Sequence, residues 1–347
     1  MKVLFTGGTG TISAAISKRA LELGWELFLL NRGNRNGAFT AQGKCTEIAC
    51  DIRADDDEAI RGKLKSALGA GYFDVVADFI AFTPEHAQKD YRIFNGLCRQ
   101  YIVISSASAY QKPLSSYLIT ESTPLANPYW EYSRNKIAIE DFLMSKYRED
   151  GFPVTIIRPS HTYDERSVPL GVHGKNGSWQ VIKRMIEGRP VIIHGDGTSL
   201  WTMTHSSDFA RAFTGLMGNI HAIGEAVQIT SDESLTWNQI YQAIAAALDV
   251  PLKAVHVSSN FLAQCSNYDF EGGLTGDKAN SVVFDNTKLK RLVPGFTAAV
   301  RFDQGVKETI AHILARPEYQ RDDPEFDAWC DRVIEAQEKA AREVRCA

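Results

Sequence analysis

The first half of the chain alternates short apolar runs with stretches whose apolar residues recur at helical spacing. The apolar runs are strand candidates at 3–6, 26–31, 46–50, 75–81, 101–105 and 154–158. Segments 12–23 and 58–68, which lie between them, show the apolar periodicity of amphipathic helices. Strands that alternate with helices predict a parallel sheet covered on both faces. We therefore expect an α/β fold built on a doubly wound, Rossmann-type parallel sheet.

The pattern loosens after Pro159. It predicts a short strand at 191–194, helices at 207–217, 237–248 and 324–345, and a late strand at 226–230 that is placed to return to the sheet. No repeat or low-complexity linker separates the two parts. We therefore predict one domain over 1–165 and a smaller, partly interleaved α/β region over 166–347.

Composition narrows the classes of function. The 347 residues are 44% hydrophobic and 23% charged, with a net charge of -4, which gives no electrostatic footprint for nucleic acid or an acidic membrane. No apolar run approaches the roughly 20 residues that span a bilayer. The first residues run straight into a strand, so no leader is expected, and the six cysteines show no metal or disulfide spacing. These features favour a cytoplasmic protein without metal, nucleic acid or membrane partners.

A glycine-rich turn follows the first strand and precedes a helix. It reads T-G-G-T-G-T-I-S at 6–13, and Ser13 stands where the G-x-G-x-x-G pattern has its last glycine. Such a turn lets backbone N–H groups approach a pyrophosphate, although tight turns need glycine in any case. The strand–turn–helix context favours a dinucleotide site and makes 1–165 the predicted cofactor domain. The turn residues predicted to bind cofactor are Gly7, Thr9, Gly10, Thr11 and Ile12.

The end of the second strand bears on the choice of dinucleotide. An acidic residue there binds the adenosine ribose of NAD, whereas an arginine accommodates the 2′-phosphate of NADP. This chain has Asn31 and Arg32, with Arg35 close behind, and no carboxylate. The pattern favours NADP over NAD, unless Arg32 is only a solvated loop residue.

A tyrosine and a lysine stand four residues apart in W-E-Y-S-R-N-K-I-A-I-E, residues 130–140. Positions i and i+4 share one face of a helix, so Tyr132 and Lys136 can point the same way. The pair alone also fits an ordinary amphipathic helix. Motifs elsewhere in the chain are needed to distinguish a functional Tyr-Lys pair from an ordinary helix face.

With the glycine turn, S-S-A-S-A-Y at 105–110 and Y-S-R-N-K at 132–136 in this order, the chain resembles the extended short-chain dehydrogenase/reductases. Within them it is similar to the NAD-dependent epimerase/dehydratase family, a likeness that segments 156–163 and 193–208 extend over nearly the whole chain. The resemblance implies pairing of two copies through helices around 84–99 and 132–148. It also implies further cofactor contacts at Asp51, Ile52, Phe79, Ile80 and Ala81.

The resemblance implies a catalytic set of Ser106, Tyr132 and Lys136. A phenol is a poor base at neutral pH, so a nearby ammonium and a positive nicotinamide ring are expected to lower the pKa of Tyr132. Ser106 would hydrogen-bond the substrate oxygen while an alcohol and a ketone interconvert. Lys136 would also hold the nicotinamide ribose.

Four positions depart from the family pattern. Dehydratases carry an Asp-Glu pair where this chain has Ala107 and Ser108, so dehydration by that route is not expected, and Ser108 suits a neutral hydrogen bond to substrate. His161 replaces the usual asparagine, and Trp201 replaces an arginine that grips a diphosphate. Both are predicted substrate-binding residues, with a core histidine and a packing tryptophan as the alternatives.

Together these features predict an NAD(P)-dependent oxidoreductase or epimerase acting on a hydroxyl or ketone of a sugar-like or other small polar substrate. Hydride transfer with the Ser-Tyr-Lys set serves dehydrogenation, reduction and epimerisation alike. A nucleotide-sugar 4-epimerase and a dinucleotide-binding scaffold with little catalysis remain the alternatives.

Overall fold

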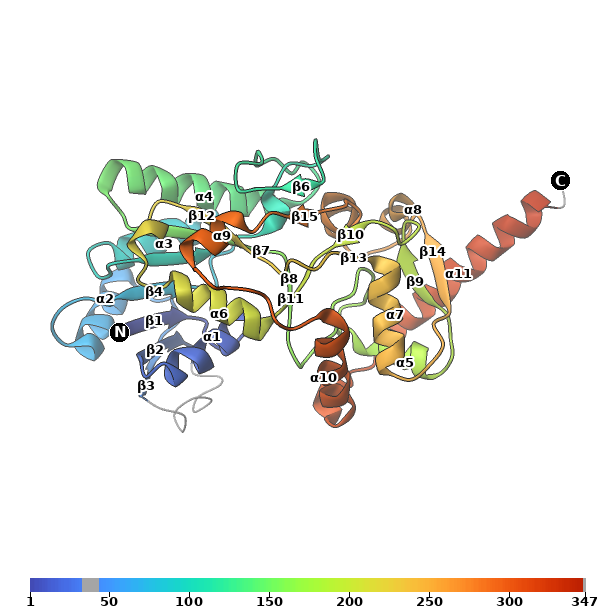
Figure 1. The fold of residues 1–347 in the computed structure, drawn as a ribbon, viewed down its shortest axis with the longest axis horizontal. Coiled ribbons are helices and arrows are strands. Elements are labelled where there is room, and N and C mark those ends of the chain that lie inside the picture. The colour runs from blue at the N-terminus through green and yellow to red at the C-terminus, as the bar shows by residue number, and fades with distance from the viewer. Residues whose placement is uncertain (33–43, 346–347) are drawn as a thin grey trace.

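A seven-stranded parallel sheet dominates the computed structural model, which describes residues 1–32 and 44–345 (Figure 1). Its strand order is β12-β7-β5-β4-β1-β2-β3. The strands are β1 (Lys2–Thr6), β2 (Glu26–Asn31), β3 (Cys45–Ala49), β4 (Val75–Asp78), β5 (Tyr101–Ile104), β7 (Val154–Pro159) and β12 (Ala226–Ile229). The chain order reverses between β1 and β4, where ligands bind outside the carboxyl ends of the strands.

Helices cover both faces of the sheet. One face is covered by α2 (Asp57–Leu68), α3 (Pro84–Phe94) and α4 (Glu131–Asp150), and the other by α1 (Thr11–Glu22), α6 (Ser206–Leu216) and α9 (Thr287–Leu292). Each face buries a separate hydrophobic core, as parallel sheets require. The predicted doubly wound α/β fold is confirmed.

The fourth strand ends at Asp78 rather than at the predicted Ala81. The buried carboxylate of Asp78 accepts a hydrogen bond of 2.8 Å from the backbone N–H of Ile80, which turns the chain. An apolar run therefore continues past the point where the strand stops.

A second lobe lies beside the carboxyl ends of the strands (Figure 1). Its helices are α5 (Trp179–Ile186), α7 (Trp237–Ala247), α8 (Ser259–Gln264), α10 (Phe302–Leu314) and α11 (Pro324–Arg345), with a π-helix over Glu271–Lys278. Short strand pairs join β6 (Leu118–Ile119) to β15 (Val283–Phe284), β8 (His161–Tyr163) to β11 (Met203–His205), β9 (Val191–His194) to β14 (Ala254–Val257), and β10 (Leu200–Trp201) to β13 (Leu235–Thr236). Elements α6, β12 and α9 return to the sheet, while the boundary at 165/166 stays a prediction.

Candidate functional site

The glycine turn between β1 and α1 has the shape that a pyrophosphate requires. Gly7 has a φ of +78°, and a Cβ there would lie 2.5 Å from the side chain of Ile80. The Ser13 hydroxyl donates to the Gly7 carbonyl at 2.6 Å and accepts from the Gly10 N–H at 2.9 Å. Ser13 therefore closes the turn in place of the last family glycine. The close-packed turn and the open N-terminus of α1 fit a dinucleotide pyrophosphate.

One hollow of about 650 Å³ lies at the ends of β1, β2 and β3. Of the predicted cofactor residues, it is lined by Gly7, Thr9, Asn31, Arg32, Asp51, Ile52 and Ile80. The sequence patterns did not assign a binding role to the five further lining residues, which are Leu30, Cys50, Arg53, Phe82 and His86. Arg32 is exposed at its rim, and Arg35 lies outside the described residues. The predicted adenosine-binding residues thus share one hollow.

A buried ion pair network lies under this hollow. Arg53 contacts Asp90 at 2.6 Å and Asp78 at 3.3 Å, and both carboxylates are fully buried. Burial and the neighbouring Asp78 charge raise the pKa of Asp90 well above its ordinary value. Hydrogen bonding to Asp90 and the Arg53 charge outweigh burial and lower the pKa of Asp78. Both acids therefore fix Arg53, which directly follows the Asp51-Ile52 pair.

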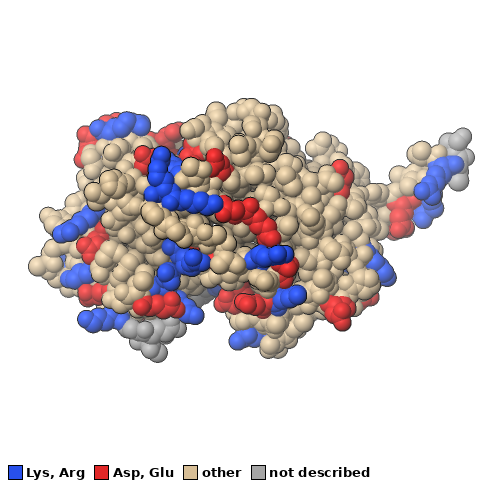
Figure 2. All heavy atoms as spheres, viewed as in Figure 1, with Lys and Arg blue, Asp and Glu red and all other residues tan. Residues whose placement is uncertain are grey.

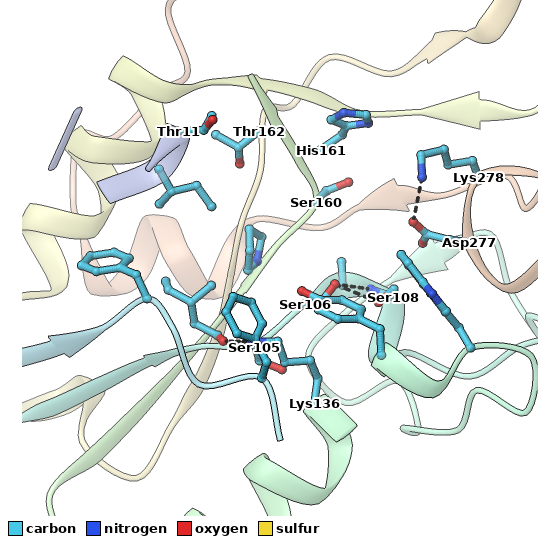
Figure 3. A pocket seen from close by; sticks show the side chains of 18 of the residues that line it. Thr11, Ser105, Ser106, Ser108, Lys136, Ser160, His161, Thr162, Asp277 and Lys278 are labelled. Atoms are coloured by element: carbon cyan, nitrogen blue, oxygen red, sulfur yellow. Dashed lines mark hydrogen bonds and ion pairs between the residues drawn. The ribbon is translucent and has the colours of Figure 1, made fainter. Parts of the chain in front are cut away.

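A second cavity of about 500 Å³ opens between the sheet and the second lobe (Figure 3). It brings together Thr11, Ile12, Phe79, Ser106, Ser108, Tyr132, Lys136, His161 and Trp201 from the prediction. It is also lined by Phe82, Trp130, Asp277 and Lys278, which the sequence did not identify. Two predicted residues line neither hollow: Gly10 caps α1, and Ala81 presents its carbonyl to Lys136.

Lys136 is buried at the point where β4 and β5 end. Its ammonium donates to the carbonyls of Ala81 and Ile104 at 2.6 and 2.8 Å, and its side chain is 1% exposed. Burial lowers its pKa to about 8, despite the opposing charges of Asp78 and Glu140. The lysine is therefore mostly charged at neutral pH and joins two strand ends.

The pKa of the Tyr132 phenol is raised, whereas the sequence motifs predicted that a nearby ammonium would help to lower it. Burial raises this pKa, a hydrogen bond with Ser106 opposes the increase, and Asp277 adds to it. Lys136 does not lower it, because the ammonium donates to backbone carbonyls and lies 5.6 Å from the centre of the Tyr132 ring. The phenol is therefore protonated at neutral pH, the form that can donate a proton.

A chain of hydroxyl groups positions Ser106. Its oxygen accepts from the Ser108 N–H at 3.1 Å, and the two serine hydroxyls are 2.8 Å apart. Ser133 donates to the Ser108 hydroxyl at 2.8 Å, and Asn127 donates to the Ser108 carbonyl at the same distance. Ser108 lines the cavity, but its hydroxyl already lies between two others. Its geometry suits orientation of Ser106 as well as the predicted substrate contact.

His161 and Trp201 line the end of the cavity away from α4. Burial lowers the pKa of His161 to about 3, with further contributions from Lys278 and His173, so the imidazole is neutral. Trp201 is 4% exposed and packs on Trp237 with ring centres 5.8 Å apart. Its indole N–H has no hydrogen-bond partner among the described residues. Trp201 is thus both a packing residue and part of the cavity wall.

The π-helix brings Asp277 and Lys278 to the same end (Figure 3). Their side chains are 14% and 15% exposed, with 4.0 Å between the carboxylate and the ammonium. Burial raises the pKa of Asp277, whereas Lys278 and Lys112 lower it. Within the described part of the chain, no hydrogen-bond donor reaches the Asp277 carboxylate. Residues far from the catalytic motifs in sequence therefore give this end its charge.

Comparison with known sequences identifies the family. A profile of the NAD dependent epimerase/dehydratase family matches residues 3–229, and the chain belongs to this family. The 2'-dehydrokanamycin reductase of Streptomyces kanamyceticus is 24% identical over 297 residues, which cover 85% of this chain and 80% of that protein. The chloroplast stem-loop binding protein of 41 kDa b from Arabidopsis thaliana is 28% identical over 255 residues, 72% of this chain and 64% of that one.

Solved structures share the fold. A dTDP-glucose 4,6-dehydratase from Bacillus anthracis in complex with NAD superposes with a TM-score of 0.72 at 18% identity, over 92% of this chain and 98% of that chain. A UDP-glucuronic acid 4-epimerase from Bacillus cereus, in complex with UDP-glucuronic acid and NAD, gives 0.70 at 19% identity, over 91% and 99%. The predicted family, Rossmann-type fold and enzymatic character are confirmed.

Proposed function

We propose that this member of the NAD-dependent epimerase/dehydratase family interconverts a secondary hydroxyl and a ketone on a sugar-like substrate. The observation that carries the proposal is the meeting of Ser106, Tyr132 and Lys136 in one cavity beside the glycine turn. A bound nicotinamide would supply or accept the hydride. Each of the three side chains then has a separate task.

Tyr132 moves the proton of the reacting oxygen. Its raised pKa keeps the phenol protonated, so it can donate to the oxygen of a ketone. Ser106 hydrogen-bonds the same oxygen and steadies the charge that develops there. Lys136 joins the turn after β4 to the end of β5 through the carbonyls of Ala81 and Ile104, and its ammonium lies 5.6 Å from the centre of the Tyr132 ring.

Reduction is the direction that we favour. The protonated phenol supports it, and so does the name of one relative, 2'-dehydrokanamycin reductase. Epimerisation would use the same residues but requires the ketone to turn before hydride returns. The relative therefore supports a choice that the three motifs leave open.

A nucleotide-sugar 4-epimerase is the second candidate. The UDP-glucuronic acid epimerase with the same fold and relatives named as UDP-glucose epimerases support it. Trp201 stands where the family resemblance places a diphosphate-binding arginine, and the Asp277 carboxylate would repel a diphosphate. We therefore expect poor turnover of UDP-glucose. Efficient UDP-glucose/UDP-galactose interconversion in a coupled assay would reverse this choice.

The proposal also includes the preferred dinucleotide, the oligomeric state and the cellular location. Asn31 and Arg32 at the rim of the adenosine hollow support NADP over NAD. A homodimer through 84–99 and 132–148 and a cytoplasmic location follow from the resemblance and the composition. No helix in the described ranges is long and apolar enough to cross a membrane.

An RNA-binding role is less well supported. One relative is named a stem-loop binding protein, but the net charge here is -4. Basic and acidic side chains alternate over the face in Figure 2, without a continuous basic patch on that face. Binding to an RNA backbone depends on such a patch.

The test is Tyr132→Phe, with Tyr129→Phe as the control for a tyrosine just outside the cavity. NADPH and NADH oxidation is followed with keto sugars, and cofactor binding is measured by calorimetry. We expect Tyr132→Phe to lower kcat by about 10²- to 10⁴-fold and to leave cofactor affinity unchanged. A Tyr132→Phe enzyme with near-normal turnover would refute the mechanism.

A further inference from the structure

Arg166 reaches the glycine turn from the segment that follows β8. Its guanidinium points toward the Thr9 carbonyl and the Thr11 hydroxyl, each 3.4 Å away. Both distances lie beyond the usual range of such hydrogen bonds. The N–H groups that face the turn are therefore only weakly satisfied by the protein.

A buried carboxylate holds the guanidinium in this place. Asp164 accepts from Nε of Arg166 at 2.7 Å, also from Nη2, and from the Arg166 backbone N–H at 3.0 Å. Asp164 is 5% exposed, whereas Arg166 is 25% exposed. Asp164 thus fixes one side of the guanidinium, while the nitrogens Nη1 and Nη2 make only long contacts with the turn.

The electrostatics of this position favour an anion. The N-terminus of α1 carries the positive end of the helix dipole, and its first turn has no acidic residue. The exposed Glu165 and the buried Asp164 are the acids of the same segment, and only Asp164 pairs with the arginine. A guanidinium fork matches the oxygens of a phosphate.

We propose that Arg166 binds the pyrophosphate of the dinucleotide cofactor, opposite the backbone N–H groups of the glycine turn. The inference rests on the proposed function, because it requires a dinucleotide at this turn. It adds a cofactor ligand from the segment after β8, outside the seven-stranded sheet. Cofactor binding would then also order the start of the predicted substrate region.

The test is calorimetric titration of Arg166→Met with NAD⁺, NADP⁺ and ADP-ribose, which share the pyrophosphate. We expect affinity for all three to fall by about 10- to 100-fold, the effect of one charge-assisted hydrogen bond. The ratio of NADP⁺ to NAD⁺ affinity should not change. The matched control is Arg189→Met, which removes another arginine paired with an aspartate, at 2.8 Å from Asp327 of α11 in the second lobe.

The outcomes separate this inference from the proposed function. Unchanged affinities together with a lower Tm would show that Arg166 only joins segments of the protein, and would overturn the inference alone. Failure of the wild-type protein to bind any dinucleotide would overturn both. If Arg166→Met does not fold, Arg166→Lys decides: a smaller loss for all three ligands supports the inference, and unchanged binding overturns it.

Discussion

The burial of Lys136 makes a prediction about stability as well as catalysis. The structure lowers its pKa from 10.5 to about 8 by burial. Folding with a charged Lys136 therefore lowers the free energy of unfolding, and this loss of stability is fully present below pH 8. As pH rises from 8 to 10.5, the folded lysine has lost its proton while the unfolded one still holds it, so stability increases through this window.

The size of the effect follows from the shift. One pKa unit corresponds to about 1.4 kcal/mol, so the wild-type protein should gain about 3 kcal/mol across the window. Lys136→Met removes the titrating group but keeps a side chain of similar length. The free energies of unfolding of wild type and variant should therefore diverge by this amount between pH 7 and pH 11, in favour of wild type.

Urea unfolding of cofactor-free protein at several pH values measures the difference. Other groups titrate in both proteins and cancel in the comparison. Lys339→Met, on the exposed end of α11, controls for the loss of a lysine as such, and its difference from wild type should stay constant. If the Lys136→Met difference is also independent of pH, the burial argument is wrong. The same variant should lose activity and cofactor affinity.

Two further predictions concern selectivity. Arg32→Ala should remove most of the preference for NADP, and Asn31→Asp should reverse it. One charge-assisted contact changes affinity by about 10- to 150-fold. If calorimetry shows that the wild type binds NAD more tightly and that Arg32→Ala binds NADP as well as the wild type does, this prediction is wrong. Asp277→Asn should raise KM for a neutral sugar substrate by about tenfold. Because Asp277 raises the pKa of Tyr132, the Asp277→Asn variant should also move the alkaline limb of the pH–rate profile to lower pH. A profile that does not move would exclude this coupling.

Local patterns were sufficient to predict the sheet and the glycine turn between β1 and α1. The strands β1, β2 and β7 are mostly apolar and almost wholly buried, and Gly7 needs its positive φ within one short turn. The i, i+4 spacing placed Tyr132 and Lys136 on one face of α4, and both line the cavity. These features depend on residues close in sequence.

Contacts distant in sequence explain what the patterns missed. The end of β4 depends on the buried carboxylate of Asp78, and the role of Arg53 depends on Asp90. The pKa of Tyr132 follows burial and the distant Asp277 rather than the neighbouring lysine. Spacing placed the ammonium near the phenol but could not show which carbonyls it would bind.

The two parts of the site have different origins, and this explains why chemistry was easier to predict than substrate. Ser106 lies just after β5, and Tyr132 and Lys136 lie on α4. The sheet holds these elements in place, so short motifs are enough to predict roles for the three residues. The opposite end of the cavity is built from β8, β10 and the π-helix, where His161, Trp201, Asp277 and Lys278 meet. A neutral imidazole, an indole and a close pair of opposite charges suit a ring with hydroxyl groups better than a dianionic diphosphate. We therefore expect that end of the cavity to decide which substrate binds.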